Sequence, residues 1–562
     1  MSARATAATL RYPALTTAAC CGGVVMSLQE TTAAMATLRA IQDDLHVPPG
    51  ALSWIASLYT LMVAVLVLTG GTVAERFGRR RVYMLGTVLI ACGSLTAATA
   101  GSYAQLLAGR AVSGVGGAVV LPTSLAILSL STDDPARRMR RVSTWITSSG
   151  VALACGPVLG GLLVDRVGWH AAYLVNVPLA AITLALTRWG VPESRTPGRS
   201  LDLPGQVCAV AGLGLTVYAI TRAGHSGYGD PVTLAALALG LLGVVALVLV
   251  ERRAADPMLR VRPMARLPHL AGLLLACCAM LGFVGACYLQ TLFFQSARGL
   301  SPLAAAVHLL ALVVPFLVTN TVSGRLLARF HPLSVAVVGF LLSAAGACVL
   351  AFCQTARASD AVSAGGMALL GAALGLTVTP ATTAAIMAVG PDDASAASSS
   401  ATAFRQFGSV LGTSVLGSVF AARFVAGLPG ALTGAGLPSS MAESIARAVR
   451  DGEGHSSSPA LARVTEAVAD ALAEGVSAAY LTAAGVLLAA AALAGFTLLR
   501  ASRPSGPSGS SGPSGPSGPS RPSRSSLKKR HSRERHSVLG HALRSRRAGG
   551  SARRGRHRAG AA

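Results

Sequence analysis

The chain has 562 residues, of which 52% are hydrophobic and only 12% charged, and its mean hydropathy is +0.58. Because soluble proteins carry about 25% charged residues, this composition excludes an ordinary water-soluble protein. The net charge of +25 gathers at the end of the chain, where 16 Lys or Arg and a single acid, Glu534, follow residue 499, so the body of the protein is not expected to bind nucleic acid.

Apolar segments recur along the chain at the length of a membrane span. A helix needs about 20 apolar residues to cross about 30 Å of hydrocarbon. Fourteen segments meet this requirement, so we expect an all-α membrane protein. They are 13–38, 52–74, 82–100, 104–131, 142–164, 171–188, 205–222, 232–250, 268–290, 303–324, 333–354, 363–389, 400–422 and 476–499.

The basic residues of the short loops predict the orientation. The six loops that follow even-numbered spans hold 18 Lys or Arg, and the six on the other face hold 5. Positive charge stays on the cytoplasmic side, so we expect a multi-pass protein of the bacterial cytoplasmic membrane with both termini in the cytoplasm.

Two related six-span halves are predicted from a repeat. Residues 71–81 close the second span, and residues 323–330 close the tenth with a weaker version of the same pattern. Parallel halves around a midplane site are a transporter architecture. The predicted parts are a cytoplasmic N-terminus (1–12), a six-helix bundle (13–200), a two-helix insert (201–260), a second six-helix bundle (261–500) and a basic tail (501–562).

Two regions outside the spans have distinctive compositions. A long extracytoplasmic loop, 423–474, contains Ala-rich segments at 440–449 and 460–473 that favour surface helices. The tail repeats Pro-Ser-Gly and then becomes Arg-rich, so we expect it to be disordered in the cytoplasm. It either rests on anionic lipid or stays solvated without a partner.

Several motifs together resemble the major facilitator superfamily, and within it the fourteen-helix drug:proton antiporter branch (EmrB/QacA-like). The first lies between spans two and three and comprises Gly71, Glu75, Arg76, Gly78, Arg79 and Arg80. Span four contains Arg110, and span five contains an antiporter-type motif, Gly150, Gly156, Pro157, Gly160 and Gly161. Span thirteen contains Arg405, Gln406 and Gly408.

The resemblance implies a major facilitator fold and a proton-coupled exporter of hydrophobic small molecules that works by alternating access, as a monomer and without a cofactor. The motif of span five carries the export direction. Met35 and Arg39 stand where the family usually has Asn and Pro, so the substrate class transfers less readily than the fold.

The motif residues also have physical interpretations of their own. Glycines four apart, such as Gly156 and Gly160, let helix backbones approach closely, which serves either a rocking interface or static packing. Pro157 bends its helix. The arginines at 79–81 near Glu75 form either a state-dependent ionic latch or a simple topological anchor.

Glu30 is the one carboxylate well inside a predicted span, where insertion of a charge costs about 2.5–3.5 kcal/mol. Its helical neighbours Gly23, Ser27 and Thr37 are small, as expected for a stripe that faces a cavity. Arg110 lies at a similar predicted depth and is expected to pair with Glu30, either as part of a proton-coupled substrate site or as a structural pair. His308, in span ten, is a further candidate for proton movement, although a packed or interfacial histidine is the alternative.

An enzyme is not expected. The first lysine is Lys528, so the body has no Walker A phosphate loop, and neither a His-Glu-x-x-His zinc motif nor a nucleophile elbow is present. The ten cysteines lack metal-ligand spacing, so we expect no metal site. The alternatives to an exporter are an importer or symporter of a small solute and a membrane sensor on the same scaffold.

Overall fold

A computed structural model describes residues 13–48, 51–132, 134–195, 202–254, 266–353, 359–389, 394–451 and 461–502. All of them belong to the first of the two units into which the chain divides, residues 1–502. The described residues form helices and no strands, which confirms the all-α prediction. The predicted N-terminal segment 1–12 and the tail from residue 503 lie outside the described residues.

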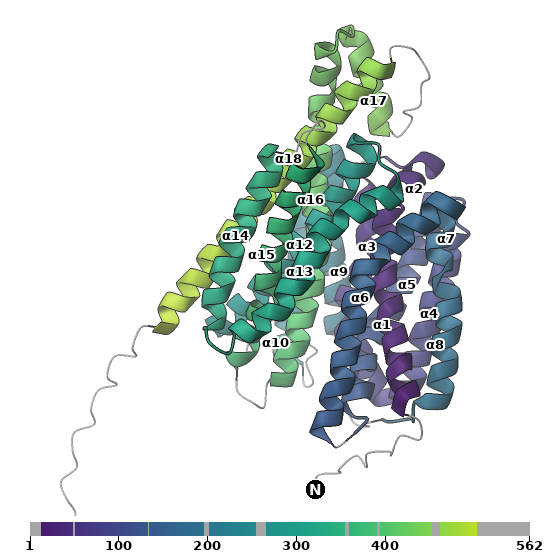
Figure 1. Cartoon of the computed structure of the whole chain (residues 1–562), viewed down its shortest axis with the longest axis vertical. Helices are drawn as coiled ribbons and strands as arrows, with labels where there is room; N and C mark the ends of the chain where they lie inside the picture. Colours follow the sequence, from purple (N-terminus) through teal and green to yellow (C-terminus); the bar gives the residue numbers. More distant parts are fainter. Residues whose placement is uncertain are drawn as a thin grey trace, which may run out of the picture. The chain divides into compact units, whose positions relative to one another are not determined.

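The first half of the body is a bundle with α1 inside it. Because α1 contacts α5, α6 and α8, its side chains are surrounded by other helices on most sides. Figure 1 shows this bundle in purple and blue. Its helices are α1 (Pro13–Ala36), α2 (Leu38–Leu45), α3 (Leu52–Phe77), α4 (Arg79–Ala98), α5 (Tyr103–Ser129), α6 (Pro135–Val167), α7 (Trp169–Leu174) and α8 (Asn176–Gly190).

The insert consists of α9 (Leu203–Ser226) and α10 (Pro231–Arg253). The two helices pack closely because Gly212 of α9 faces Gly243 of α10, and a Cβ on Gly212 would lie 2.7 Å from the Gly243 carbonyl carbon. Many large apolar side chains of α10 are exposed, among them Leu239 and Leu242, as expected for a helix that faces lipid.

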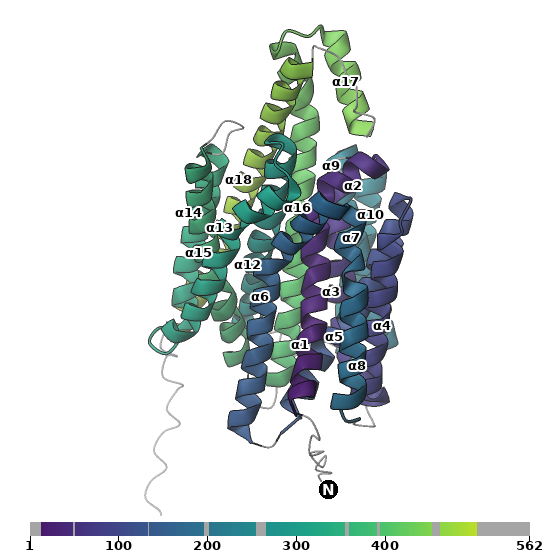
Figure 2. The ribbon, with the colours of Figure 1, turned by 45° about the vertical axis from the view of Figure 1, so that its right-hand side comes forward.

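The second half is built from longer helices. They are α12 (Leu267–Leu292) with its π-helical continuation η2 (Phe293–Ala297), α13 (Pro302–Leu326), α14 (Pro332–Cys353), α15 (Asp360–Met387), α16 (Ala394–Gly434), α17 (Ser439–Asp451) and α18 (Leu461–Ser502). The two halves meet along two helix pairs, α3 with α16 and α6 with α13. Figure 2 shows α6 beside α13 at one of these two pairs.

The number of spans can be compared with the predicted fourteen. Among the described residues, 12 helices are long and apolar enough to cross a membrane, and α3 becomes the thirteenth if its two parts, which meet at a 56° bend between Val67 and Thr69, form one span. α1 is not among them because its polar residues lower its hydropathy, although its 24 residues match a predicted span. Its count as the fourteenth span therefore stays a prediction.

In its described parts, 423–451 and 461–474, the region expected to be a long loop is largely helical. α16 has 41 residues and α18 has 42, and each continues well past its predicted span. A helix of that length extends over about 60 Å, twice the hydrocarbon thickness. The predicted surface helices are present, but the second is the first part of α18 and not a separate element.

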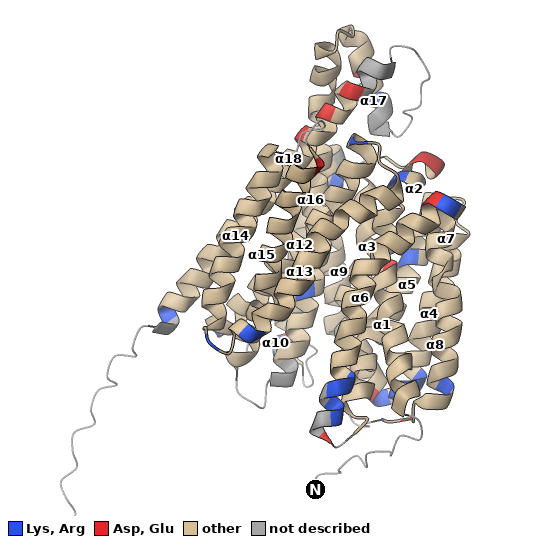
Figure 3. Ribbon diagram, viewed as in Figure 1, with Lys and Arg blue, Asp and Glu red and all other residues tan. Residues whose placement is uncertain are grey.

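The two ends of the body differ in charge (Figure 3). We call the end near Arg79–Arg81 the arginine side and the end that carries α17 the α17 side. Arginines of α4 and α6 gather on the arginine side, whereas acidic residues of α2 and α18 lie on the α17 side. This asymmetry corresponds to the excess of basic residues that the sequence places in the loops on one face.

Candidate functional site

Glu30 and Arg110 form an ion pair in the interior of the first bundle. Arg110 Nη1 lies 3.1 Å from Glu30 Oε2, and the two side chains are 0% and 1% exposed. The same nitrogen donates to the Glu30 backbone carbonyl at 3.1 Å, so the arginine grips both the side chain and the main chain of α1. The predicted pairing is confirmed.

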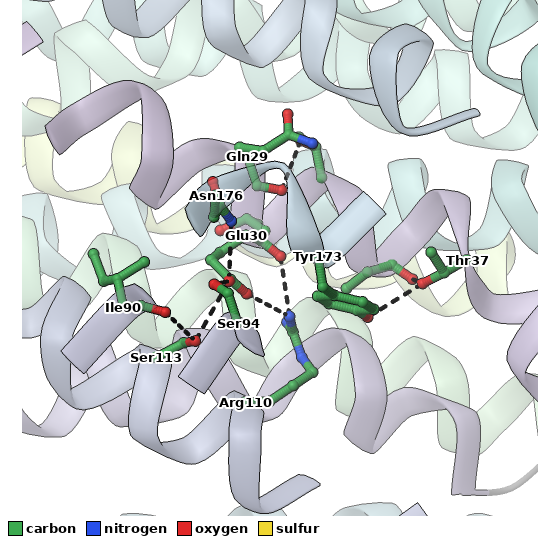
Figure 4. A network of polar contacts seen from close by, with 12 residues as sticks. Gln29, Glu30, Thr37, Ile90, Ser94, Arg110, Ser113, Tyr173 and Asn176 are labelled. Carbon is green, nitrogen blue, oxygen red and sulfur yellow. Dashed lines mark hydrogen bonds and ion pairs between the residues drawn. The ribbon is translucent and has the colours of Figure 1, made fainter. Parts of the chain in front are cut away.

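The other carboxylate oxygen of Glu30 receives hydrogen bonds from two further helices (Figure 4). Asn176 Nδ2 of α8 donates to Oε1 at 3.0 Å, and the Ser94 hydroxyl of α4 donates to the same atom. Ser113 Oγ of α5 lies 3.4 Å from it. Four donors from three helices thus converge on one carboxylate, which is how a protein stabilises the charged form of an acid away from water.

The guanidinium of Arg110 is less completely satisfied. Its Cζ lies 5.7 Å from the ring centre of Tyr59 and 5.8 Å from that of Tyr173, both within the range of cation–π attraction. Its Nε and Nη2 are buried and have no hydrogen-bond partner among the described residues. Arg110 therefore retains donor capacity that no acceptor among the described residues uses.

The small residues of α1 pack against neighbouring helices. Gly23 packs against the Tyr83 hydroxyl of α4, Ser27 is buried, and Thr37 Oγ1 lies 3.2 Å from Tyr173 Oη. The expectation that this stripe faces a cavity stays a prediction, because small side chains on a helix suit a cavity and close packing by other helices equally.

His308 lies apart from the Glu30 pair. Its ring nitrogen Nδ1 contacts the Ala304 carbonyl at 2.8 Å, and its Nε2 lies 3.8 Å from Asp360 Oδ2 on α15. Asp360 in turn pairs with Arg298 at 2.7 Å. The contacts of His308 thus belong to the second half, on the α17 side, and the structure does not bring it together with Glu30 and Arg110.

The motif between α3 and α4 is tied to the end of α8. Arg79 Nη2 lies 3.7 Å from Glu75, but the backbone N–H of Arg80 and of Arg81 donate to the Glu193 carboxylate at 3.1 and 3.3 Å. Gly78 has φ +110°, and a Cβ there would lie 2.6 Å from Glu193 Oε1, so only glycine fits this turn.

The remaining residues of this motif, Arg76 and Gly71, make few contacts with other helices. Arg76 is exposed and lies over the Phe77 ring at 5.5 Å, and a Cβ on Gly71 would find only Pro122 at 3.8 Å. The contacts described for this motif are therefore all within the first half.

The antiporter-type motif lies on α6 and serves two different interfaces. Gly156 packs against Thr32 of α1, whereas Gly161 faces α13 of the other half, where a Cβ would lie 2.6 Å from the Pro302 carbonyl oxygen. Gly160 and Pro157 are buried, and Gly150 has only Leu317 of α13 at 3.8 Å. Gly161 therefore lies at the junction of the halves, and Gly156 belongs to packing within one half.

The span-thirteen motif lies on α16. Gly408 packs directly against the Cys277 carbonyl of α12, which is a contact within the second half. Arg405 and Gln406 are half-buried, and Arg405 Nε has no hydrogen-bond partner in the described segments. The glycine of this motif is thus explained by helix packing, while its arginine is not.

The two halves are joined by hydrogen bonds on the α17 side. Asp165 Oδ2, at the end of α6, accepts from Ser301 Oγ at 2.8 Å and from the Leu303 N–H at 3.2 Å, where α13 begins. Gln295 of η2 accepts from the Arg39 N–H at 3.4 Å and donates to the Ala36 carbonyl at 3.3 Å. The structure therefore has its halves held together at this end.

Several of these residues were not identified from the sequence. Ser94 and Asn176 are single polar residues in apolar helices, and only the folded arrangement places them on Glu30. Glu193 and Asp165 sit in segments that look like connecting loops or helix ends. A polar residue within an apolar run is the signal that would have found Asn176.

The comparisons with known proteins agree with this fold. Residues 19–413 match the model of the Major Facilitator Superfamily. The chain is 31% identical over 401 residues to the multidrug resistance protein Stp of Mycobacterium tuberculosis, covering 71% of this chain and 74% of Stp. It is also 31% identical over 487 residues to the tetracenomycin C resistance and export protein of Streptomyces glaucescens, covering 84% and 90%.

A solved structure supports the same fold. The POT family transporter PepTSo aligns with a TM-score of 0.60 at 13% identity, covering 87% of this chain and 98% of that one. The chain therefore belongs to the major facilitator superfamily, in its drug:proton antiporter branch. It is a membrane transporter and not an enzyme.

In the described ranges, no group of three or more His, Cys, Asp or Glu is arranged to hold a metal ion.

Proposed function

We propose that this protein exports hydrophobic small molecules, among them antibiotics, in exchange for protons. The related proteins are named for resistance to, or export of, several antibiotics, which supports a small-molecule cargo. The observation that carries proton coupling is Glu30, a fully buried carboxylate whose four neighbours all donate hydrogen bonds to it.

Protonation of Glu30 would change this site in a defined way. A protonated carboxyl carries an O–H donor of its own and loses the charge that holds Arg110. At least one of the four donors must then turn away, and the guanidinium keeps only its hydrogen bond to the Glu30 backbone carbonyl. Because these donors belong to α4, α5 and α8, loss of the pair loosens the contact of α1 with its own bundle, which links proton uptake to movement of helices.

The placement in the membrane is part of the proposal. We place the arginine side, and with it both termini, in the cytoplasm, supported by the excess of basic residues in the loops on that side. We further propose that the protein acts as a monomer, without a cofactor, and that the basic tail lies near anionic lipid.

Transport in reconstituted vesicles tests the proposal. The purified protein is placed in proteoliposomes with an imposed pH gradient and offered a panel that includes tetracenomycin C, puromycin and hydrophobic dyes. Gradient-driven export is expected for the wild type and its loss for Glu30→Gln. The matched control is Glu443→Gln on the exposed face of α17, which should transport as the wild type does.

Each other outcome has a clear meaning. Equal export by Glu30→Gln and the wild type would remove Glu30 from the coupling. Export that is indifferent to collapse of the pH gradient would overturn the antiport mechanism. Accumulation in the direction of the proton flow would identify an importer instead.

A further inference from the structure

The insert covers one of the two junctions between the halves. α9 packs against α3 of the first half and against α16 of the second. A buried apolar cluster shared by the three helices contains Leu61 and Val65 of α3, Val217 of α9 and Val410 of α16. Since α3 and α16 themselves form the junction, α9 lies along it.

Near the arginine side, α9 is bound to α3 by one side chain. Gln206 is 9% exposed, and its Nε2 donates to the Val65 carbonyl at 2.8 Å while its Oε1 accepts from the Thr69 hydroxyl. The 56° bend of α3 falls between Val67 and Thr69, so the two ends of one amide hold the helix on both sides of its bend.

Two features lie at the bend of α3, the Gly70–Gly71 pair and the side chain of Gln206. Sharp kinks in helices arise at proline, at glycine or serine pairs, or where a side chain inserts into the backbone hydrogen-bond ladder. α3 contains no proline, and Gly70 and Gly71 follow the bend and make it easier. The Gln206 amide takes a carbonyl of α3 as its acceptor at the bend, in an otherwise apolar contact.

Near the α17 side, α9 is bound to the other half. Tyr228, just after α9, has its hydroxyl 3.1 Å from Ser418 Oγ of α16. Gly224 lies so close to α16 that a Cβ would come within 2.6 Å of Ser418 Cα. α9 therefore has one polar anchor on each half, at opposite ends of the helix.

We propose that α9 is a tether that couples the bend of α3 to the angle between the two halves, with Gln206 as its positioning residue. In alternating access the halves rock against each other, so the crossing of α3 and α16 must change. A helix anchored to α3 at one end and to α16 at the other resists that change unless α3 alters its bend. This inference rests on the proposed transport function and assigns the insert a part in it.

The test measures the angle between the halves without a substrate. Spin labels are placed in a cysteine-free background, in the full chain in nanodiscs, at exposed positions of the junction that α9 does not cover. One pair, Val167 and Val307, reports the α17 side, and the other, Ile146 and Val322, reports the arginine side. Distances are recorded at pH 7.5 and at pH 5.5.

Gln206→Leu removes both hydrogen bonds at similar volume. We expect the population with the short Val167–Val307 distance to fall at least twofold, with a matching shortening across Ile146–Val322. Val207→Leu is the matched control, because Val207 is 67% exposed on the same helix, and it should leave both distributions unchanged. The midpoint of thermal unfolding separates this shift from a loss of folding.

A pair of variants at Thr69 keeps the test decisive if Gln206→Leu fails to fold. Thr69→Val removes the hydroxyl bound to Gln206 and should shift the distances in the same direction, whereas Thr69→Ser keeps it and should not. The double variant Gln206→Leu/Thr69→Val should differ little from Gln206→Leu alone, since the hydrogen bond that Thr69→Val removes is already lost in Gln206→Leu. Unchanged distances in Gln206→Leu or Thr69→Val, or an equal shift in Val207→Leu, would overturn the tether; since no substrate is used, this outcome is separate from absence of transport.

Discussion

The Asn176 amide lies 3.0 Å from the same Glu30 oxygen that the Ser94 hydroxyl also contacts. α8 and α4 therefore each donate a hydrogen bond to one oxygen atom of α1, although the two helices are far apart in the sequence. A charge buried to this depth is stable only while its donors stay in place, so the packing of the helices around α1 and the burial of this carboxylate depend on each other.

Replacement of Asn176 by Leu should weaken this site without removing the acid. A hydrogen bond to a charged group contributes about 1.5–3 kcal/mol, and a loss of that size is expected in the free energy of unfolding in detergent. The double variant Glu30→Gln/Asn176→Leu should lose less than the sum of the single changes, because glutamine carries no charge. Additive losses would show that Asn176 acts elsewhere.

Replacement of Asp165 by Asn should loosen the α17 side. Asp165 accepts hydrogen bonds from the Ser301 hydroxyl and the Leu303 N–H where α13 begins, and a negative charge at a helix N-terminus contributes about 0.3–1 kcal/mol. We expect a modest lengthening of the mean Val167–Val307 distance measured with spin labels. Arg166→Gln, on the adjacent exposed residue, is the control, and a shift of the same size there would contradict a role of the Asp165 cap.

Replacement of Gly78 by Ala should destabilise the turn between α3 and α4. The residue has φ +110° and the Glu193 carboxylate occupies the place of a side chain, so a loss of about 1–3 kcal/mol is expected. Gly214→Ala on α9 is the matched control, since nothing lies within 4 Å of its Cβ position and alanine favours helix. Thermal unfolding in detergent checks this: the midpoint should fall for Gly78→Ala and should not fall for Gly214→Ala.

The turn between α9 and α10 should be sensitive to acid. The hydrogen bond from Arg222, together with the N–H of Thr233, lowers the pKa of Asp230. A lowered pKa in the folded protein means that this carboxylate contributes stability above its unfolded pKa of about 3.9, and that the contribution is lost as the pH falls through the folded value.

Asp230→Asn should therefore lower the midpoint of thermal unfolding at pH 7, and the difference from the wild type should shrink toward pH 3. A difference that stays constant over this range would mean that ionisation of Asp230 has no part in it.

The fold was predictable from the sequence because lipid imposes a simple rule. Each apolar segment of about 20 residues must become a helix whose backbone bonds to itself, so spans are predicted without knowing their neighbours. The same rule failed at α16 and α18, because a helix continues beyond the membrane wherever its residues favour it. Helix propensity, and not hydropathy, sets those ends.

The site was predictable only in part. Glu30 and Arg110 stand out because charges in apolar segments are costly, so each predicts a partner. Their donors Ser94 and Asn176 give a weaker signal, since a lone hydroxyl or amide in a span costs less than a charge and does not by itself predict a partner. The direction that Glu30 faces depends on which helices surround α1, and small residues such as Gly23 suit a cavity and a packed helix equally.

The continuous helices α16 and α18 have a mechanical consequence. A rigid rod that leaves the membrane magnifies at its tip any tilt at its base: about 10 residues beyond the bilayer make an arm of about 15 Å, so a 10° tilt displaces the far end by about 3 Å. α17, which packs on α16 at that far end, would move with it. A fluorophore on α17 should thus report, from outside the bilayer, changes in the tilt of α16 within it.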